Sequence, residues 1–151
     1  MTKSNILAYA PKQIVANGDS KEWAVCSYYG IDRISHDHTT YAAGSDTNVG
    51  DLHISVKSSG FTLMSGYLCK GLETFDEIWG FYKSTTHSNR VGYVDKEFNL
   101  FLMNMQEFEE FLYTFGRIER ESAKNGGGLK IRCRKESQKM LRWLNARAVP
   151  A

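Results

Sequence analysis

The chain has 151 residues, of which 42% are hydrophobic and 24% are charged, and its net charge is +2. This length suits one compact domain with its own core, so we expect a single domain over residues 1–151. No apolar run approaches the length of a membrane span, and the three cysteines are odd in number and far apart, which argues against a membrane protein and a disulfide framework and favours a cytoplasmic protein.

The first predicted helix follows Asp19 and stops at Gly30. Asp19 is a suitable N-cap, Glu22 lies three residues on in a capping-box position, and glycine commonly ends a helix. A polar, turn-rich stretch comes next. It contains His36 and His38, which alone are too few to hold a metal, so we interpret them as loop residues.

An alternating strand begins at Asp51, after a turn at Asn48 and Gly50. Because successive side chains of a strand point to opposite faces, its residues separate into two sets. The apolar set is Leu52, Ile54 and Val56, and the polar set is Asp51, His53, Ser55 and Lys57. A polar face of this kind can gather reactive groups at one site.

The remaining elements alternate between helical and strand patterns. In chain order they are a helix from Leu72 to Tyr82, strands over residues 90–95 and 98–105, a helix from Asn104 to Ile118, a strand over 129–135 and a helix over 136–146. This order predicts an α/β or α+β fold in which helices flank a central mixed β-sheet.

The segment with the clearest chemistry contains Asp46, Ser55 and Lys57. Metal-dependent hydrolysis of a phosphodiester needs carboxylates to hold the cation, and a lysine can stabilise the charge that develops on the phosphate. Asp46 precedes the turn, and Lys57 lies on the strand that follows it. The spacing therefore brings a carboxylate and a lysine to one hairpin.

This pattern resembles the PD-(D/E)XK, or restriction-endonuclease-like, nuclease superfamily. In that family an acid near a hairpin is followed about ten residues later by an acid-x-lysine tripeptide. Asp46 matches the first acid, Lys57 matches the lysine, and the segment "ISVKSSG" (54–60) has Ser55 in place of the second acid. The resemblance covers residues 20–118 and implies an endonuclease that cuts double-stranded DNA with Mg²⁺, for which Mn²⁺ can substitute.

Serine cannot replace a carboxylate as a ligand of full charge for a hard cation. One interpretation is that the acid has moved, as the resemblance allows, to Glu73 or Glu77 on the following helix, or to Asp51 on the same strand face. The alternative is a degenerate nuclease fold that binds nucleic acid or protein, for example as a phage inhibitor. Independently of these two interpretations, the structural alternative for Lys57 is an edge-strand lysine that blocks aggregation.

Other residues are expected to support this site. Glu22, His53 and Ser55 are candidates to hydrogen-bond and orient the metal ligands. The last 28 residues hold eight basic side chains against one acid, Glu136, a surplus that a solvated helix face would explain equally well. If the surplus binds DNA, we expect backbone phosphate contacts from Arg132, Arg134, Lys135, Lys139 and Arg142. Cutting both strands would favour a homodimer.

Overall fold

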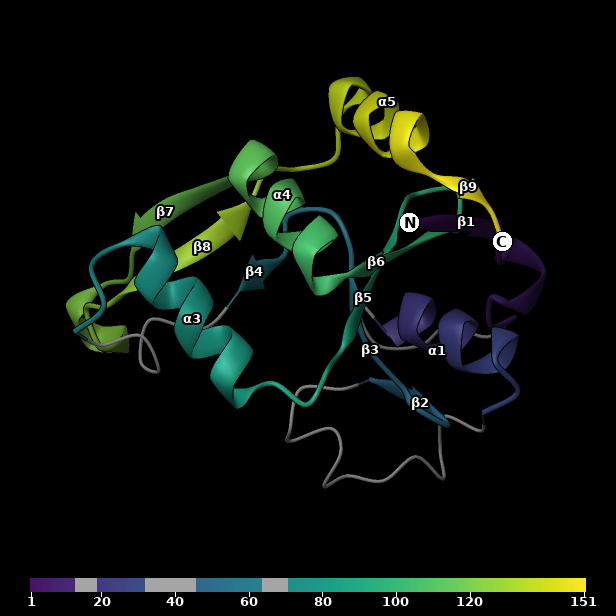
Figure 1. Ribbon diagram of the computed structural model, residues 1–151, viewed down its shortest axis with the longest axis horizontal. Coiled ribbons are helices and arrows are strands. Elements are labelled where there is room, and N and C mark those ends of the chain that lie inside the picture. The colour runs from purple at the N-terminus through teal and green to yellow at the C-terminus, as the bar shows by residue number, and fades with distance from the viewer. Residues whose placement is uncertain (13–18, 32–45, 64–70) are drawn as a thin grey trace.

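A computed structural model describes residues 1–12, 19–31, 46–63 and 71–151, which form two β-sheets and four α-helices (Figure 1). The mixed α/β character predicted from the sequence is therefore confirmed. His36 and His38 lie outside the described residues. Within the described ranges, no helix combines the length and the apolarity that crossing a membrane requires.

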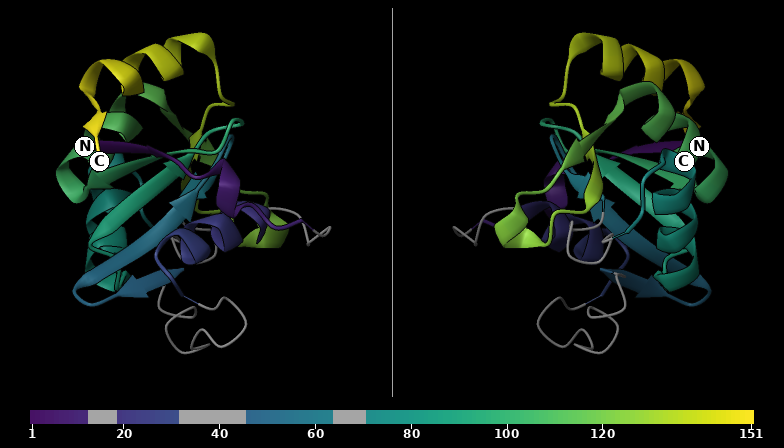
Figure 2. Two further views of the ribbon diagram at one scale, coloured as in Figure 1. Left: turned by 90° about the vertical axis from the view of Figure 1, so that its right-hand side faces the viewer. Right: turned by 90° about the vertical axis from the view of Figure 1, so that its left-hand side faces the viewer.

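The larger sheet has six strands and is mixed. In spatial order they are β2 (Thr47–Val49), β3 (Leu52–Lys57), β5 (Arg90–Val94), β6 (Asn99–Asn104), β1 (Thr2–Asn5) and β9 (Val149–Pro150). β3 runs parallel to β5, and β1 runs parallel to β9, while the other pairs are antiparallel. The β1–β9 pair holds the two termini side by side (Figures 1 and 2).

A second, three-stranded sheet was not expected from the sequence. It contains β4 (Thr62–Leu63), β8 (Leu129–Cys133) and β7 (Gly116–Arg120), in that spatial order. The helix predicted to reach Ile118 ends at Phe115, so that prediction was wrong at its C-terminal end. Ile118 instead pairs with Ile131 across β7 and β8 and is 43% exposed.

The helices begin where the sequence supplies a cap. α1 (Asp19–Tyr28), α3 (Phe75–Thr85), α4 (Met105–Phe115) and α5 (Gln138–Arg147) agree with the expected helices to within a few residues at most ends. Asn104 and Glu107 form a capping box at the start of α4, and Thr74 and Ser137 cap α3 and α5. Each cap satisfies backbone N–H groups that the first helical turn leaves without partners.

The larger sheet has a separate core on each face. On one face, Trp79 of α3 and Phe108 of α4 pack with Tyr93 of β5. On the other face, Val25 of α1 packs with Val94 of β5. Figures 1 and 2 show α3 and α4 on the side of the sheet opposite to α1. The polar residues of β3 can therefore be assigned to one of these two layers.

Candidate active site

Asp46 is fixed at the edge of the larger sheet by the β2–β3 hairpin. Its backbone N–H donates to the carbonyl of Ile54 at 2.8 Å, which continues the β2–β3 pairing by one residue. Its carboxylate Oδ2 accepts a hydrogen bond from the backbone N–H of Val56 at 2.7 Å. The Asp46 side chain thus accepts from a backbone N–H of β3 that lies beyond the part of β3 paired with β2. This bond holds the carboxylate beside the last residues of β3.

Lys57 is the last residue of β3 and is half-buried. Burial lowers the pKa of its amine, because a charged group loses solvation, while the carboxylates of Asp46 and then Glu22 act in the opposite direction. Its Nζ also lies 5.8 Å from the centre of the Phe61 ring. Lys57 at the end of β3 is therefore influenced by Asp46, which immediately precedes β2, and by Glu22 of α1. These three residues are here called the Lys57 cluster.

Glu22, whose carboxylate favours the charged form of Lys57, lies on α1, which packs on the face of the larger sheet opposite to α3 and α4 and contacts the hairpin. Ala24, Val25 and Cys26 are fully buried on the inner side of α1. The Sγ of Cys26 lies 3.1 Å from Oγ1 of Thr47 and 3.6 Å from the carbonyl oxygen of Asp46. Packing and these contacts tie the helix to the residue that follows Asp46. The position of Glu22 relative to Asp46 is thereby set by the fold.

Ser55 lies in the interior, on the same face of β3 as Lys57. It is 2% exposed and is paired in register with Val91, which belongs to the core beneath α3 and α4. Burial raises the pKa of Tyr82 on α3, the hydroxyls of Thr86 and Ser55 oppose that shift, and Asp46 adds to it. The position that the nuclease motif would assign to its second acid is therefore a buried hydroxyl between β3 and α3.

The two glutamates proposed to replace the missing acid contact other residues. Glu73 is exposed and lies 3.4 Å from the guanidinium of Arg120. Glu77 is exposed, and its carboxylate accepts a hydrogen bond from Thr74 at 3.0 Å at the N-terminus of α3. Glu73 therefore lies just before the N-cap of α3 and Glu77 lies in its first turn, whereas Tyr82, which faces Ser55, lies near its end.

Asp51 and His53 lie towards the opposite end of β3 from Lys57. Asp51 is in the β2–β3 turn, six residues before Lys57, which corresponds to about 20 Å along an extended strand. The ring of His53 contacts Asn48, with 2.6 Å between Nδ1 and Oδ1. The structure therefore separates both residues from the Lys57 cluster.

The carboxylates of the Lys57 cluster suit a Mg²⁺ ion only if that ion has few protein ligands. Among the described residues, no group of three or more His, Cys, Asp or Glu side chains could hold a metal. Asp46 and Glu22 supply two carboxylates near Lys57. Mg²⁺ often keeps several waters and is held by one or two carboxylates together with substrate phosphates, so this pair is compatible with it. Mn²⁺ accepts the same oxygen ligands.

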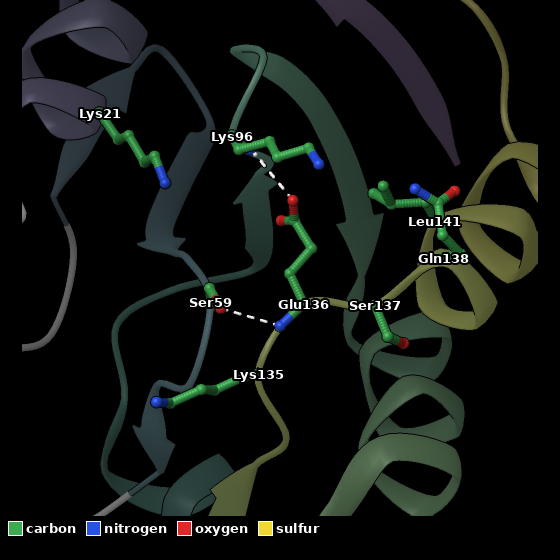
Figure 3. Close-up of a pocket in the computed structure, with 8 residues that line it drawn as sticks. All are labelled: Lys21, Ser59, Lys96, Lys135, Glu136, Ser137, Gln138 and Leu141. Atoms are coloured by element: carbon green, nitrogen blue, oxygen red, sulfur yellow. Dashed lines mark hydrogen bonds between the residues drawn. The ribbon is translucent and has the colours of Figure 1, made fainter.

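A hollow of about 500 Å³ is lined by residues that are close in the sequence to the Lys57 cluster. Lys21, which precedes Glu22, and Ser59, two residues after Lys57, line it together with Lys96 and Lys135 (Figure 3). Of the predicted DNA contacts, Lys135 lines this hollow, Arg132 and Arg134 line a neighbouring one, and Arg142 lines another.

Sequence reasoning missed Lys21 and Lys96 as members of this surface. The chain carries no local signal for them, because they come from α1 and from the β5–β6 turn. Only the tertiary fold brings them to Lys135, which precedes α5. Lys139, which was also predicted to contact DNA, is an exposed residue of α5 and does not line any of these three hollows.

Comparison of the chain with protein-family models, with curated proteins and with solved structures finds no match.

Proposed function

We propose that the protein is a Mg²⁺-dependent DNA endonuclease built on a restriction-endonuclease-like core. The observation that supports this most strongly is the Lys57 cluster, in which a half-buried lysine with a lowered pKa interacts with two carboxylates from separate elements. Removing a lysine from water is unfavourable unless it has partners or a role. The spacing of Asp46 and Lys57 in the sequence, and their resemblance to the nuclease motif, point to the same chemistry.

In this proposal each residue of the cluster has a distinct task. Asp46 and Glu22 would hold the ion. When bound, Mg²⁺ polarises the scissile phosphate and increases the acidity of a water molecule. Lys57 would stabilise the negative charge that develops on the phosphate, and its lowered pKa would bring proton exchange closer to neutral pH. The hydrogen bond from Val56 keeps the Asp46 carboxylate in place during these steps.

One such site hydrolyses one strand. Cleavage of both strands of double-stranded DNA would require two sites related by the two-fold symmetry of the duplex, so we expect a homodimer for that activity.

The test is cleavage of supercoiled plasmid by the purified protein with Mg²⁺ and with EDTA, in the wild type and in Lys57→Met. Methionine retains much of the length of lysine and removes its charge. We expect Mg²⁺-dependent nicking or linearisation, and a loss of about 10²- to 10³-fold in rate for the variant. Lys83→Met, an exposed lysine on α3, is the matched control and should cleave like the wild type. Equal rates for the two variants would refute the role of Lys57.

A second candidate function is a binding module derived from a nuclease fold. Ser55 favours it, because the position of the family's second acid is occupied by a buried hydroxyl and not by a carboxylate. This alternative predicts that the protein binds its partner but does not cleave DNA with any common divalent cation. It also predicts that Asp46→Ala leaves the affinity for nucleic acid unchanged.

A further inference from the structure

Three hollows of the surface adjoin one another and form one groove. The hollow that contains Lys21 shares Lys135 with a hollow of about 310 Å³ bordered by β7 and β8. It shares Lys96, Gln138 and Leu141 with a hollow of about 690 Å³ that lies along α5. Because the hollows have lining residues in common, they are neighbours on the surface. We call this surface the α5 groove.

The α5 groove carries more positive charge than the whole chain. Its lining includes eight cationic side chains and four carboxylates, so its net charge is +4, whereas that of the chain is +2. Two of the cations, Arg117 and Arg132, lie within ion-pair distance of Glu119. Among the described residues, no carboxylate lies within ion-pair distance of the other six, which are Lys3, Lys21, Lys96, Arg134, Lys135 and Arg142.

Two of the groove's carboxylates are used by the protein itself. Glu136 accepts a hydrogen bond from the hydroxyl of Tyr93 at 2.9 Å. It accepts another from the backbone N–H of Lys96 at 3.2 Å, which Figure 3 shows. Asp95 is 4% exposed and accepts the backbone N–H groups of Glu97 and Asn99, both at 2.9 Å. These acids therefore organise the walls of the groove, and their charges are included in the net charge of +4.

The chemistry of the lining identifies the kind of ligand. The described residues that line the three hollows include no aromatic side chain, so the groove offers no ring on which a base could stack. Lysine and arginine contacts of this kind recognise phosphates and do not read sequence. Each hollow has the size of a small-molecule site, roughly 300–1,000 Å³, which suits individual nucleotides of one flexible strand better than a stiff duplex.

We infer that the α5 groove binds the sugar–phosphate backbone of a single nucleic-acid strand. Its middle section contains Ser59 and Lys21, which are close along the chain to Lys57 and Glu22. Under the proposed nuclease function, the groove holds a single-stranded part of the substrate next to the Lys57 cluster. That link to catalysis rests on the proposed function, whereas binding of the strand does not.

The test is fluorescence anisotropy of a 5′-labelled 20-nucleotide oligodeoxythymidylate with the full chain in EDTA, over a series of salt concentrations. Lys21→Gln, Lys96→Gln and Lys135→Gln should each weaken binding by about three- to tenfold and reduce the salt slope by about 0.7. The triple variant should weaken binding further. Lys83→Gln on α3 is an exposed control and should bind within about twofold of the wild type. Circular dichroism confirms that each variant is folded.

Three results would overturn the inference: unchanged binding by the triple variant, an equal loss in Lys83→Gln, or tighter binding of a 20-base-pair duplex than of the single strand. The nuclease proposal fails separately. A protein that binds the strand through the three lysines but does not cut plasmid with Mg²⁺ would retain the groove and lose the enzyme. A protein that cuts plasmid while the triple variant binds normally would retain the enzyme and lose the groove.

Discussion

Lys57 shows how burial and two carboxylates together set the state of one amine. Burial favours its neutral form, and Asp46 and Glu22 favour its charged form, with burial the larger influence. The Asp46 carboxylate is held by the N–H of Val56, so its effect on Lys57 does not depend on a freely moving side chain. The balance between the neutral and the charged form of Lys57 therefore depends on the hairpin and on the packing of α1 against it.

Replacing Asp46 should shift that balance in a known direction. Asp46→Asn keeps an oxygen that can accept from Val56 but removes a charge that raises the pKa of Lys57. We expect the pKa of Lys57, which is already lowered, to fall further in the variant. A pH titration of the lysine side-chain resonances by NMR would measure it. A pKa that rises or stays the same would show that Asp46 does not act on Lys57 as described.

At the residue scale, the sequence named all three residues of the cluster but gave Glu22 only the role of orienting the metal ligands. The spacing of Asp46 and Lys57 on one hairpin followed from strand alternation and from the resemblance to the nuclease motif. The proximity of Glu22 to Lys57 depends on how α1 packs, through Cys26 and Thr47, and such tertiary contacts leave no local pattern. This is why the sequence offered Glu73 and Glu77 as equally reasonable carboxylates.

At the scale of the elements, the boundary between α4 and β7 is set by Gly116. The apolar spacing of the sequence continues to Ile118, but the helix ends at Phe115. A Cβ at position 116 would lie 2.5 Å from the carbonyl oxygen of Leu112 and 3.0 Å from Cγ2 of Ile131. Only glycine allows the chain to leave the helix this tightly and enter β7.

This close approach predicts opposite effects for two glycine substitutions. Gly116→Ala should lower the free energy of unfolding by about 1–3 kcal/mol, because the added methyl group has no room. Gly80→Ala, in the exposed interior of α3 with nothing within 4 Å of the new Cβ, should raise it by about 0.5–1 kcal/mol. Urea denaturation measures both. Similar changes in the two variants would contradict the steric explanation.

Short strands were the elements that the sequence could not predict. β1 has four residues and β9 has two, so neither provides enough alternation to be recognised. Their existence depends on pairing between the two ends of the chain, where Thr2 lies opposite Val149. The longer helices were predicted because caps such as Asn104 and Glu107 act locally and are visible in the sequence.

At the scale of the whole molecule, folding gathers positive charge at the α5 groove, and the sequence reveals only part of it. The basic C-terminal residues could be recognised directly. The contribution of Lys3, Lys21 and Lys96 could not, because β1, α1 and the β5–β6 turn meet α5 only after folding. The same elements contribute to the Lys57 cluster and to the α5 groove. The chain passes from Lys57 at the end of β3 to Ser59 in the groove, and α1 carries both Lys21 and Glu22.

The most direct test of the proposed active site compares two glutamates in Mg²⁺-dependent cleavage of plasmid DNA. Glu22→Gln removes a carboxylate of the Lys57 cluster, whereas Glu77→Gln alters an exposed carboxylate at the first turn of α3 with a residue that still suits a capping box. We expect Glu22→Gln to reduce the rate by about 10²-fold or more and Glu77→Gln to leave it within about twofold of the wild type. Loss of cleavage in Glu77→Gln with normal cleavage in Glu22→Gln would contradict the assignment of the site.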